Sequence, residues 1–425
     1  MNYFILILFI LTYIFLIIGR VNKLWVVLTS TVLLLITGTI GFSQAFHFVN
    51  WNVLALFVGM LILADLFIES KVPAFLASSL ASRAKNVAFA FLFICILTSI
   101  LSAFVENVAT VLIIAPIAIC LAQQMKIKAA PLLIGIAICS NLQGTATLIG
   151  DPPSMLLAGW TKMSFNDFFW FHGAPGIFFA VQAGAIVSFF ILYLIFKKYK
   201  GKVGKIEPVK VKTWIPTVLL ILLIVSLALS SALAKEKTYL IGVLTLAFGF
   251  IGIIWNIARR GLKSLPGLIK PLDWNTSLFL LFIFILVGSL EPGGIIAKLT
   301  EFLKSSTGNN AFLTYSLIVW FSVICSAFID NVPYLIMMLH VVAGLSVGLG
   351  VSPYLLYFGL LIGASVGGNI TPIGASANIV AVGLAKSRAS EKIGFGQFVK
   401  IGLPFTIAAV FAAWLFGWFF WKGIS

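Results

Sequence analysis

Long apolar stretches separated by short polar turns recur along the whole chain. Most are about twenty residues long, which is the length that an α-helix needs to cross a bilayer. They lack the short alternating segments that are typical of a membrane β-barrel. We therefore predict an all-α polytopic membrane protein with about ten crossing helices. In chain order these helices lie at about 2 to 18, 24 to 43, 51 to 68, 130 to 159, 174 to 196, 214 to 232, 238 to 257, 275 to 290, 354 to 385 and 402 to 421.

Two further apolar stretches, 88 to 124 and 311 to 350, carry polar residues at their centres. Basic residues flank the first stretch on both sides, and Lys and Arg collect in cytoplasmic loops. The stretch is therefore expected to enter and leave the membrane on the same side. We predict two re-entrant hairpins whose polar tips reach the middle of the bilayer, where interrupted backbone survives only inside protein or beside a wet cavity.

The two halves of the chain repeat each other. "SAFVENV" at 102–108 returns as "SAFIDNV" at 326–332, and "GTATLIG" at 144–150 returns as "GNITPIG" at 368–374, each 224 residues later. Loop charge indicates that the helices beginning at Trp51 and Trp274 cross the membrane in opposite directions. Inverted-topology repeats of this kind are typical of secondary transporters.

These patterns predict the organisation of the whole chain. In order, we expect N-terminal scaffold helices at 1–50, repeat 1 at 51–196 with its hairpin at 88–124 and a broken helix at 130–159, a basic cytoplasmic loop at 197–212, linking helices at 213–272, and repeat 2 at 273–425 with its hairpin at 311–350 and a broken helix at 354–385.

Composition and charge agree with a membrane protein surrounded by lipid. Hydrophobic residues make up 61% of the chain and charged residues 9%, and the net charge of +16 is concentrated in short loops. We expect a multi-pass protein of the cell (inner) membrane. The basic segment "KKYKGKVGKIEPVKVK" at 197–212 indicates the cytoplasmic side, and both termini are then expected on the external side. Because the basic residues serve topology, we expect no nucleic-acid partner. The four cysteines lack metal-ligand spacing, so we expect no metal and no cofactor.

The repeated motifs hold the candidate site. Gly and Pro interrupt "SNLQGTATLIGDPPS" at 140–154 and "GGNITPIGASANIV" at 367–380, which predicts two broken helices. A break exposes carbonyl groups and aims the positive N-terminus of a half-helix at the membrane centre. The candidate substrate- or ion-binding residues are Glu106, Asn107, Asn141, Thr145, Thr147, Gly150, Asp151, Asp330, Asn331, Asn369, Thr371, Gly374 and Asn378.

The carboxylates at the two tips need a physical explanation. Placing a charged side chain at a helix centre in the bilayer costs about 3 kcal/mol. Neither repeat contains a Lys or Arg in its central segment to pair with Glu106 or Asp330. We therefore expect each acid to be protonated, bound to a cation, or wetted by a cavity. A helix cap is the structural alternative, and it is compatible with transport. Whether Glu106, Asp151 or Asp330 carries the proton stays open.

These motifs resemble the ion transporter superfamily. The tips Glu106-Asn107-Val108 and Asp330-Asn331-Val332, with "TLIGDPPS" and "TPIGASAN" after them, are most similar to the arsenite permease (ArsB), NhaD and P-protein branch, and more distantly to the divalent anion/sodium symporters. The resemblance covers the chain from about Trp51 to Trp421. It implies an elevator-type carrier, often dimeric, with its site between the tips and the broken helices.

The chain departs from the symporters at its tips. Glu106 and Asp330 replace the first residue of the symporters' Ser-Asn-Thr tips, and Val108 and Val332 replace the last. Loss of these hydroxyls disfavours sodium-coupled dicarboxylate uptake, and the added carboxylates favour proton or cation coupling instead.

The leading hypothesis is proton-coupled efflux of arsenite or antimonite. The alternatives are a Na⁺/H⁺ antiporter, transport of another small oxyanion, silicic acid or a carboxylate such as citrate, and a passive channel. The Gly-x-Gly-Asp context of an intramembrane protease is absent, so we expect no enzyme activity. The chain has no phosphate-binding loop, so an ATP-driven mode requires a separate ATPase subunit. A homodimer is a further expectation.

Overall fold

The chain folds into packed α-helices, as its apolar pattern predicts. The computed structural model describes residues 3–19, 21–201, 208–290, 300–301, 305, 308, 310–349 and 352–424. Within these ranges the strands are β1 (Trp170–Phe171) and β2 (Ala174–Pro175), which pair antiparallel in the connection before α10. Residues 202–207 of the predicted basic loop and residue 350 of the second predicted hairpin lie outside the described residues.

The first half of the chain contains two N-terminal helices, a short helix and the first set of repeat elements. Their bounds are α1 (Tyr3–Ile18), α2 (Lys23–Ile36), α3 (Phe42–Phe48), α4 (Trp51–Ser70), α5 (Val72–Ser82), α6 (Val87–Ser102), α7 (Asn107–Gln124), α8 (Ala130–Gly144), α9 (Pro152–Thr161), η1 (Asn166–Phe168) and α10 (Ile177–Phe196).

The second half begins with two long linking helices and then returns to the same order of elements. Their bounds are α11 (Ile215–Leu233), α12 (Leu240–Arg260), η2 (Leu262–Ser264), α13 (Leu265–Ile269), α14 (Trp274–Gly288), α16 (Ala311–Ser326), α17 (Asn331–Leu349), α18 (Pro353–Gly367), η3 (Gly368–Ile370), α19 (Ser376–Arg388) and α20 (Phe395–Trp421).

Seven described helices are long and apolar enough to cross a membrane, or up to eight if the pair 262–269 and 274–288, bent by 57°, counts as one span. The shorter apolar helices include α1, α2, α6, α8 and α16. The sequence-based figure of about ten counted α1 and α2 as full spans and joined each broken helix into one. The structure instead ends α2 at Ile36 and follows it with the separate helix α3.

Helices are interrupted where the tip and break motifs predict. Turns separate α6 from α7 and α16 from α17, directly before Asn107 and Asn331. The helix that starts at residue 130 stops at Gly144, and the helix that starts at residue 353 stops at Gly367. In each case a new helix begins several residues later, so the polar motifs lie at helix ends.

The repeated sequence produces repeated contacts. The hydroxyl of Thr147 donates to the carbonyl of Ala103, and 224 residues later the hydroxyl of Thr371 donates to the carbonyl of Ala327. Likewise, the hydroxyls of Ser102 and Ser326 each donate to a carbonyl on the helix before the break. These bonds fix each hairpin turn against the broken helix of its own half. The opposite orientation of the two halves in the membrane stays a prediction.

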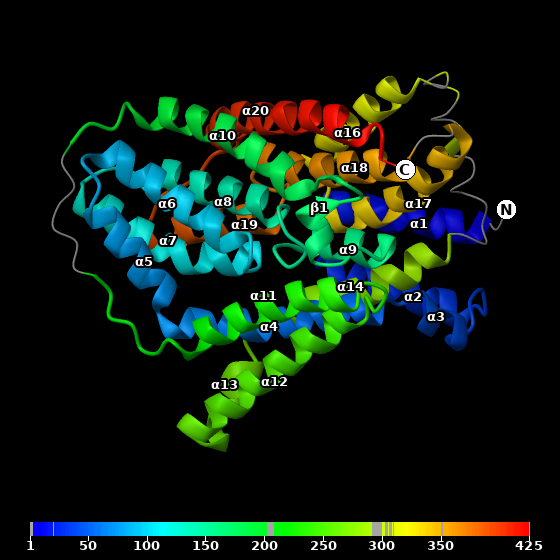
Figure 1. The fold of residues 1–425 in the computed structure, drawn as a ribbon, viewed down its shortest axis with the longest axis horizontal. Helices are drawn as coiled ribbons and strands as arrows, with labels where there is room; N and C mark the ends of the chain where they lie inside the picture. Colours follow the sequence, from blue (N-terminus) through cyan, green and yellow to red (C-terminus); the bar gives the residue numbers. More distant parts are fainter. Residues whose placement is uncertain are drawn as a thin grey trace.

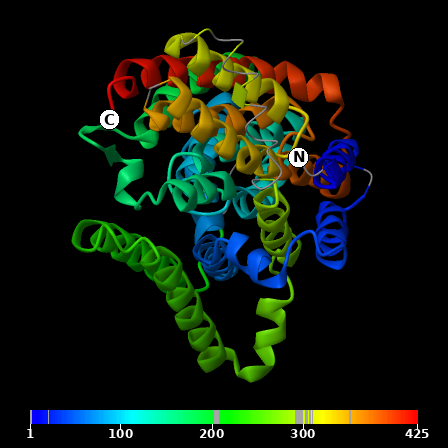
Figure 2. The same cartoon turned by 90° about the vertical axis from the view of Figure 1, so that its right-hand side faces the viewer.

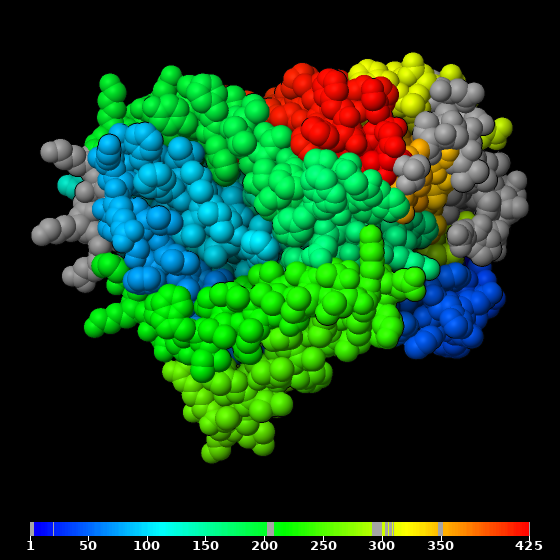
Figure 3. Space-filling model, in the orientation of Figure 1, coloured from blue at the N-terminus to red at the C-terminus, as the bar shows by residue number. Residues whose placement is uncertain are grey.

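The broken helices lie inside the molecule and the linking helices lie outside. Figure 1 shows α10 and α20 side by side along one edge, and Figure 2 shows α11 and α12 standing away from the packed centre. The most apolar windows of α4 and α18 are 72% and 83% buried, compared with 33% for α11 and α12. In the space-filling view of Figure 3, α11 and α12 cover the lower edge of the visible face. Their exposed apolar faces are typical of helices in contact with lipid.

Candidate functional site

Six helices begin around one small cavity, which we call the tip cavity. It has a volume of about 30 Å³, and its lining includes the first residues of α2, α7, α9, α17 and α19 together with Asp273, which directly precedes α14. The tips of both halves contribute to it, because Glu106 and Asn107 line it together with Asp330 and Asn331. Each helix start carries a positive partial charge. The fold therefore gathers six positive helix ends around a few carboxylates.

Acidic side chains cap four of these helix starts. A carboxylate oxygen of Glu106 accepts the N–H of Ala109 at 2.8 Å, and one of Asp330 accepts the N–H of Val332 at 3.2 Å. Asp273 and Asp151 accept a backbone N–H in the same way at the starts of α14 and α9. A carboxylate at this position satisfies a free donor and complements the helix dipole. Both tip acids therefore cap helix starts, which was the structural alternative for them, and Asp273 and Asp151 do the same.

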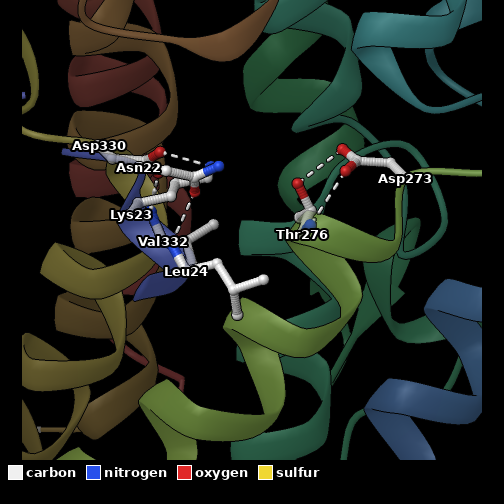
Figure 4. Close-up of polar contacts among 7 residues, drawn as sticks. All are labelled: Asn22, Lys23, Leu24, Asp273, Thr276, Asp330 and Val332. Carbon is white, nitrogen blue, oxygen red and sulfur yellow. Dashed lines mark hydrogen bonds and ion pairs between the residues drawn. The ribbon is translucent and has the colours of Figure 1, made fainter. Parts of the chain in front are cut away.

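A lysine from outside both repeats pairs with the second tip. The ammonium Nζ of Lys23 lies 3.0 Å from Oδ2 of Asp330, and the two side chains are 28% and 27% exposed (Figure 4). The expectation that Asp330 lacks a basic partner is therefore wrong, because it considered only the repeats. A contact between residues 307 positions apart leaves no local signal in the sequence. Asp273, the residue directly before α14, also lines the tip cavity.

Four asparagines connect the two halves beneath the cavity. The side chain of Asn107 donates to Oδ1 of Asn141 at 3.1 Å. Asn141 in turn donates to Asn369 at 2.8 Å and to Asn378 at 2.9 Å. All four side chains are buried. The chain of amides thus runs from the first hairpin tip, through α8, to the break in the second half.

The carboxylate of Asp151 is only partly satisfied. It is buried; one oxygen accepts the N–H of Ser154, and within the described part of the chain the other oxygen has no hydrogen-bond partner. The hydroxyl of Ser365 on α18 is also buried, and it interacts with this carboxylate. By the repeat offset, Ser365 corresponds to Asn141 and Asp151 to Ala375.

The remaining candidates shape the site rather than face the cavity. The hydroxyls of Thr147 and Thr371 donate hydrogen bonds to backbone carbonyls, and the hydroxyl of Thr145 donates one to the carbonyl of Asn141. Gly150 and Gly374 bring the breaks close to the hairpin turns. A Cβ atom on either glycine would lie 2.9 Å from the carbonyl oxygen of Ser102 or Ser326, respectively.

A larger cavity lies further along three of the same helices. It measures about 440 Å³, and its lining includes His47, Trp51, Trp160, Phe284 and His340. The helices α9, α14 and α17 contribute residues to this cavity and also border the tip cavity with their N-terminal ends. The tip cavity and the larger cavity therefore lie at different positions along the same three helices. A third space of about 90 Å³ connects Asp65 on α4 with Glu106 and Asp273.

Comparisons with known proteins point to membrane transporters. The family model described as "Citrate transporter" matches residues 13–363 and 240–423. The chain is 29% identical to the "46 kDa membrane protein" of Mycobacterium leprae over 96% of both chains. It is 27% identical to "P protein" of Mus musculus over 84% of this chain and 53% of that relative.

Two solved structures share the fold. The YdaH transporter of Alcanivorax borkumensis matches with a TM-score of 0.63 and 15% identity over 98% of this chain and 96% of its own. MtrF of Neisseria gonorrhoeae, described among a class of antimetabolite efflux pumps, matches with a TM-score of 0.55 and 16% identity over 98% and 94%. At these identities the likeness concerns the fold alone.

Proposed function

The chain belongs to the citrate transporter family of membrane transporters, and from that premise we propose that it exchanges a small solute for protons at the tip cavity. The leading solute is arsenite or antimonite, moved outward as protons move inward. The observation that carries the proposal is the meeting of carboxylates and amides from both halves at one cavity.

The size and chemistry of the cavity favour a small solute. A volume of about 30 Å³ has room for about two water molecules. An ion or a small neutral hydroxide suits this space better than a tricarboxylate such as citrate. The amides of Asn107 and Asn331 and the free ends of helices offer both donors and acceptors to hydroxyl groups. Citrate, silicic acid or another oxyanion would require the cavity to widen.

The tip acids supply the coupling in this proposal. A proton that binds Asp330 or Glu106 from the outside would neutralise the carboxylate. This would weaken its attraction to the helix start that it caps, and in the case of Asp330 also to Lys23, and would allow the tip to move. Release of the proton on the cytoplasmic side would restore the charge and accompany solute exit. Movement of the tips and broken helices as one elevator-like unit would carry the site between the tip cavity and the larger cavity along α9, α14 and α17.

Na⁺/H⁺ exchange is the second candidate, and one contact favours it. The tip cavity already holds a monovalent cationic group, the ammonium of Lys23, against Asp330. A site that binds an ammonium at 3.0 Å is chemically suited to Na⁺ or to a proton in its place. The acids would then bind the two ions in turn.

Further parts of the proposal concern assembly and orientation. We propose that the basic segment at 197–212 is cytoplasmic and that both termini are external. The described ends of the chain lie toward the opposite end of the molecule from residues 197–201 and 208–212 in Figure 1, which supports this orientation. A homodimer stays a proposal, as does a separate ATPase subunit.

Everted membrane vesicles with an imposed pH gradient test the function. Uptake of arsenite and of Na⁺ is measured with and without the gradient, in vesicles with and without the protein. Gradient-dependent accumulation of arsenite supports the leading candidate, and gradient-dependent Na⁺ uptake supports the second. If neither solute accumulates above the vesicles that lack the protein, both candidates are rejected.

A further inference from the structure

Lys23 gives the tip cavity a built-in positive charge. Among the described residues that line this cavity it is the one basic side chain, and it faces Asp330 together with Glu106 and Asp273. Asp151 lies behind Pro152 at the start of α9 and adds a fourth carboxylate nearby. The charged groups around Lys23 are thus all acidic, and they come from four different helix starts. Lys23 belongs to neither repeat.

The N-terminal helices hold Lys23 in place. The hydroxyl of Tyr13 on α1 donates to the carbonyl of Pro333 at 2.7 Å, close to the second tip. The hydroxyl of Thr31 on α2 donates to the carbonyl of Phe282 on α14 at 3.3 Å. The ammonium of Lys23 also lies 5.0 Å from the ring centroid of Phe279, where the face of an aromatic ring attracts a cation. The lysine is therefore a positioned member of the site.

We propose that Lys23 is a tethered counter-ion that competes with the transported cation or proton for Asp330. The ammonium occupies the carboxylate whenever the coupling ion is absent, so the empty site keeps its charge balance. Lys23 acts through Asp330 and is a positioning residue. The inference rests on the proposed function, because it requires a coupling ion to bind at Asp330.

Partial exposure of the pair makes the competition reversible. A fully buried carboxylate left without its partner is costly, whereas an ion pair in contact with water contributes little net stability. Both side chains are slightly more than one quarter exposed and line the tip cavity, so an arriving ion can reach the carboxylate from the cavity. The apparent affinity for the ion equals the intrinsic affinity multiplied by the fraction of molecules in which Lys23 has left Asp330.

The test compares cation binding by the purified full-length chain and its variants. Thermal unfolding is followed while Na⁺ or Li⁺ replaces choline at constant ionic strength, and separately on acidification. Lys23→Gln should bind at least one of these ions about tenfold more tightly than the unchanged protein, because the competitor is gone. Lys23→Arg should resemble the unchanged protein. Lys85→Gln, at an exposed lysine before α6, is the matched control for loss of one charge.

A double variant tests whether the effect of Lys23 on ion binding depends on the Asp330 carboxylate. If Lys23 competes at Asp330, the gain in affinity disappears when Lys23→Gln is combined with Asp330→Asn. An equal affinity for all three ions in Lys23→Gln and in the unchanged protein overturns the inference, as does a gain that persists in the double variant. Binding is measured without transport, so a failure here is distinguishable from a failure of vesicle uptake.

If Lys23→Gln does not fold, the unchanged protein provides the answer. Reductive methylation of Lys23, quantified by peptide mass spectrometry at fixed pH, should accelerate when Na⁺ or Li⁺ replaces choline. The rate is also followed at several pH values relative to that of Lys85, because a coupling proton would displace Lys23 on acidification. Relative rates that change with neither cation nor pH would overturn the inference.

Discussion

Nδ2 of Asn141 lies 2.8 Å from Oδ1 of Asn369, although 228 positions separate the two residues in the sequence. Asn141 belongs to the helix before the first break, and Asn369 lies in the second break. This buried bond joins the two halves of the chain directly beneath the first hairpin tip. It provides a physical reason for the halves to act together, since moving one without the other would leave buried amides without partners.

Asn141→Ala should both destabilise the protein and reduce transport. The substitution leaves buried groups of Asn107, Asn369 and Asn378 without partners, and each unsatisfied group costs about 1–3 kcal/mol. Thermal unfolding in detergent measures the first effect and vesicle uptake the second. Asn275→Ala, at an exposed position on α14, should leave both unchanged. An Asn141→Ala protein with unaltered stability would show that the amide chain is dispensable.

Gly150→Ala and Gly374→Ala should each destabilise the protein. The added Cβ would meet backbone carbonyls at 2.9 Å, and backbone cannot give way as a flexible side chain can. Overpacking of this kind costs about 1–3 kcal/mol, which thermal denaturation detects. Gly383→Ala on α19 is the matched control, because open space surrounds the new methyl group. Equal stability of all three variants would mean that the breaks are not held against the hairpin turns.

Asp330→Asn should abolish proton-coupled transport and leave folding intact. An amide can still accept the N–H of Val332, but it cannot exchange a proton or balance Lys23. Uptake into everted vesicles measures the effect, and size-exclusion chromatography checks the fold. Glu236→Gln, at an exposed position between α11 and α12, removes one acidic charge away from the tip cavity and should retain transport. Normal transport by Asp330→Asn would remove this acid from the mechanism.

The orientation can be tested with single cysteines in intact cells. A membrane-impermeant thiol reagent should label Lys237→Cys, in the connection before α12, and should spare Lys198→Cys, because basic segments stay in the cytoplasm. Both variants carry Cys120→Ser to remove the exposed native thiol. The reverse labelling pattern would invert the proposed topology.

Much of the architecture could be predicted because its signals are local or repeated. Apolar stretches of helical length gave the fold class, and the polar strings around Asn107 and Gly150 predicted where helices stop. The resemblance to the ion transporter superfamily, drawn from the same strings, is confirmed by the family match. The repeat offset also predicted that Asn107 and Asn331 would belong together, and both line the tip cavity.

Tertiary contacts between segments far apart in the sequence could not be predicted, because they leave no local sequence pattern. Nothing near Lys23 in the sequence marks Asp330 as its partner. Helix lengths were also misjudged for the N-terminal pair, since α2 ends at Ile36 and its polar continuation forms a turn before α3. The roles of Thr147 and Thr371 depend on which carbonyl each hydroxyl reaches, and that follows only from packing.

Cross-linking across the tip cavity tests whether the tips of both halves share one transport site. Val108 and Val332 both line this cavity, so Val108→Cys combined with Val332→Cys, in the Cys120→Ser background, places one thiol on each tip. A short reducible cross-linker should join the two thiols in native membranes and stop transport, and reductant should restore it. Failure to cross-link, or full transport by the cross-linked protein, would contradict a site shared by the two tips.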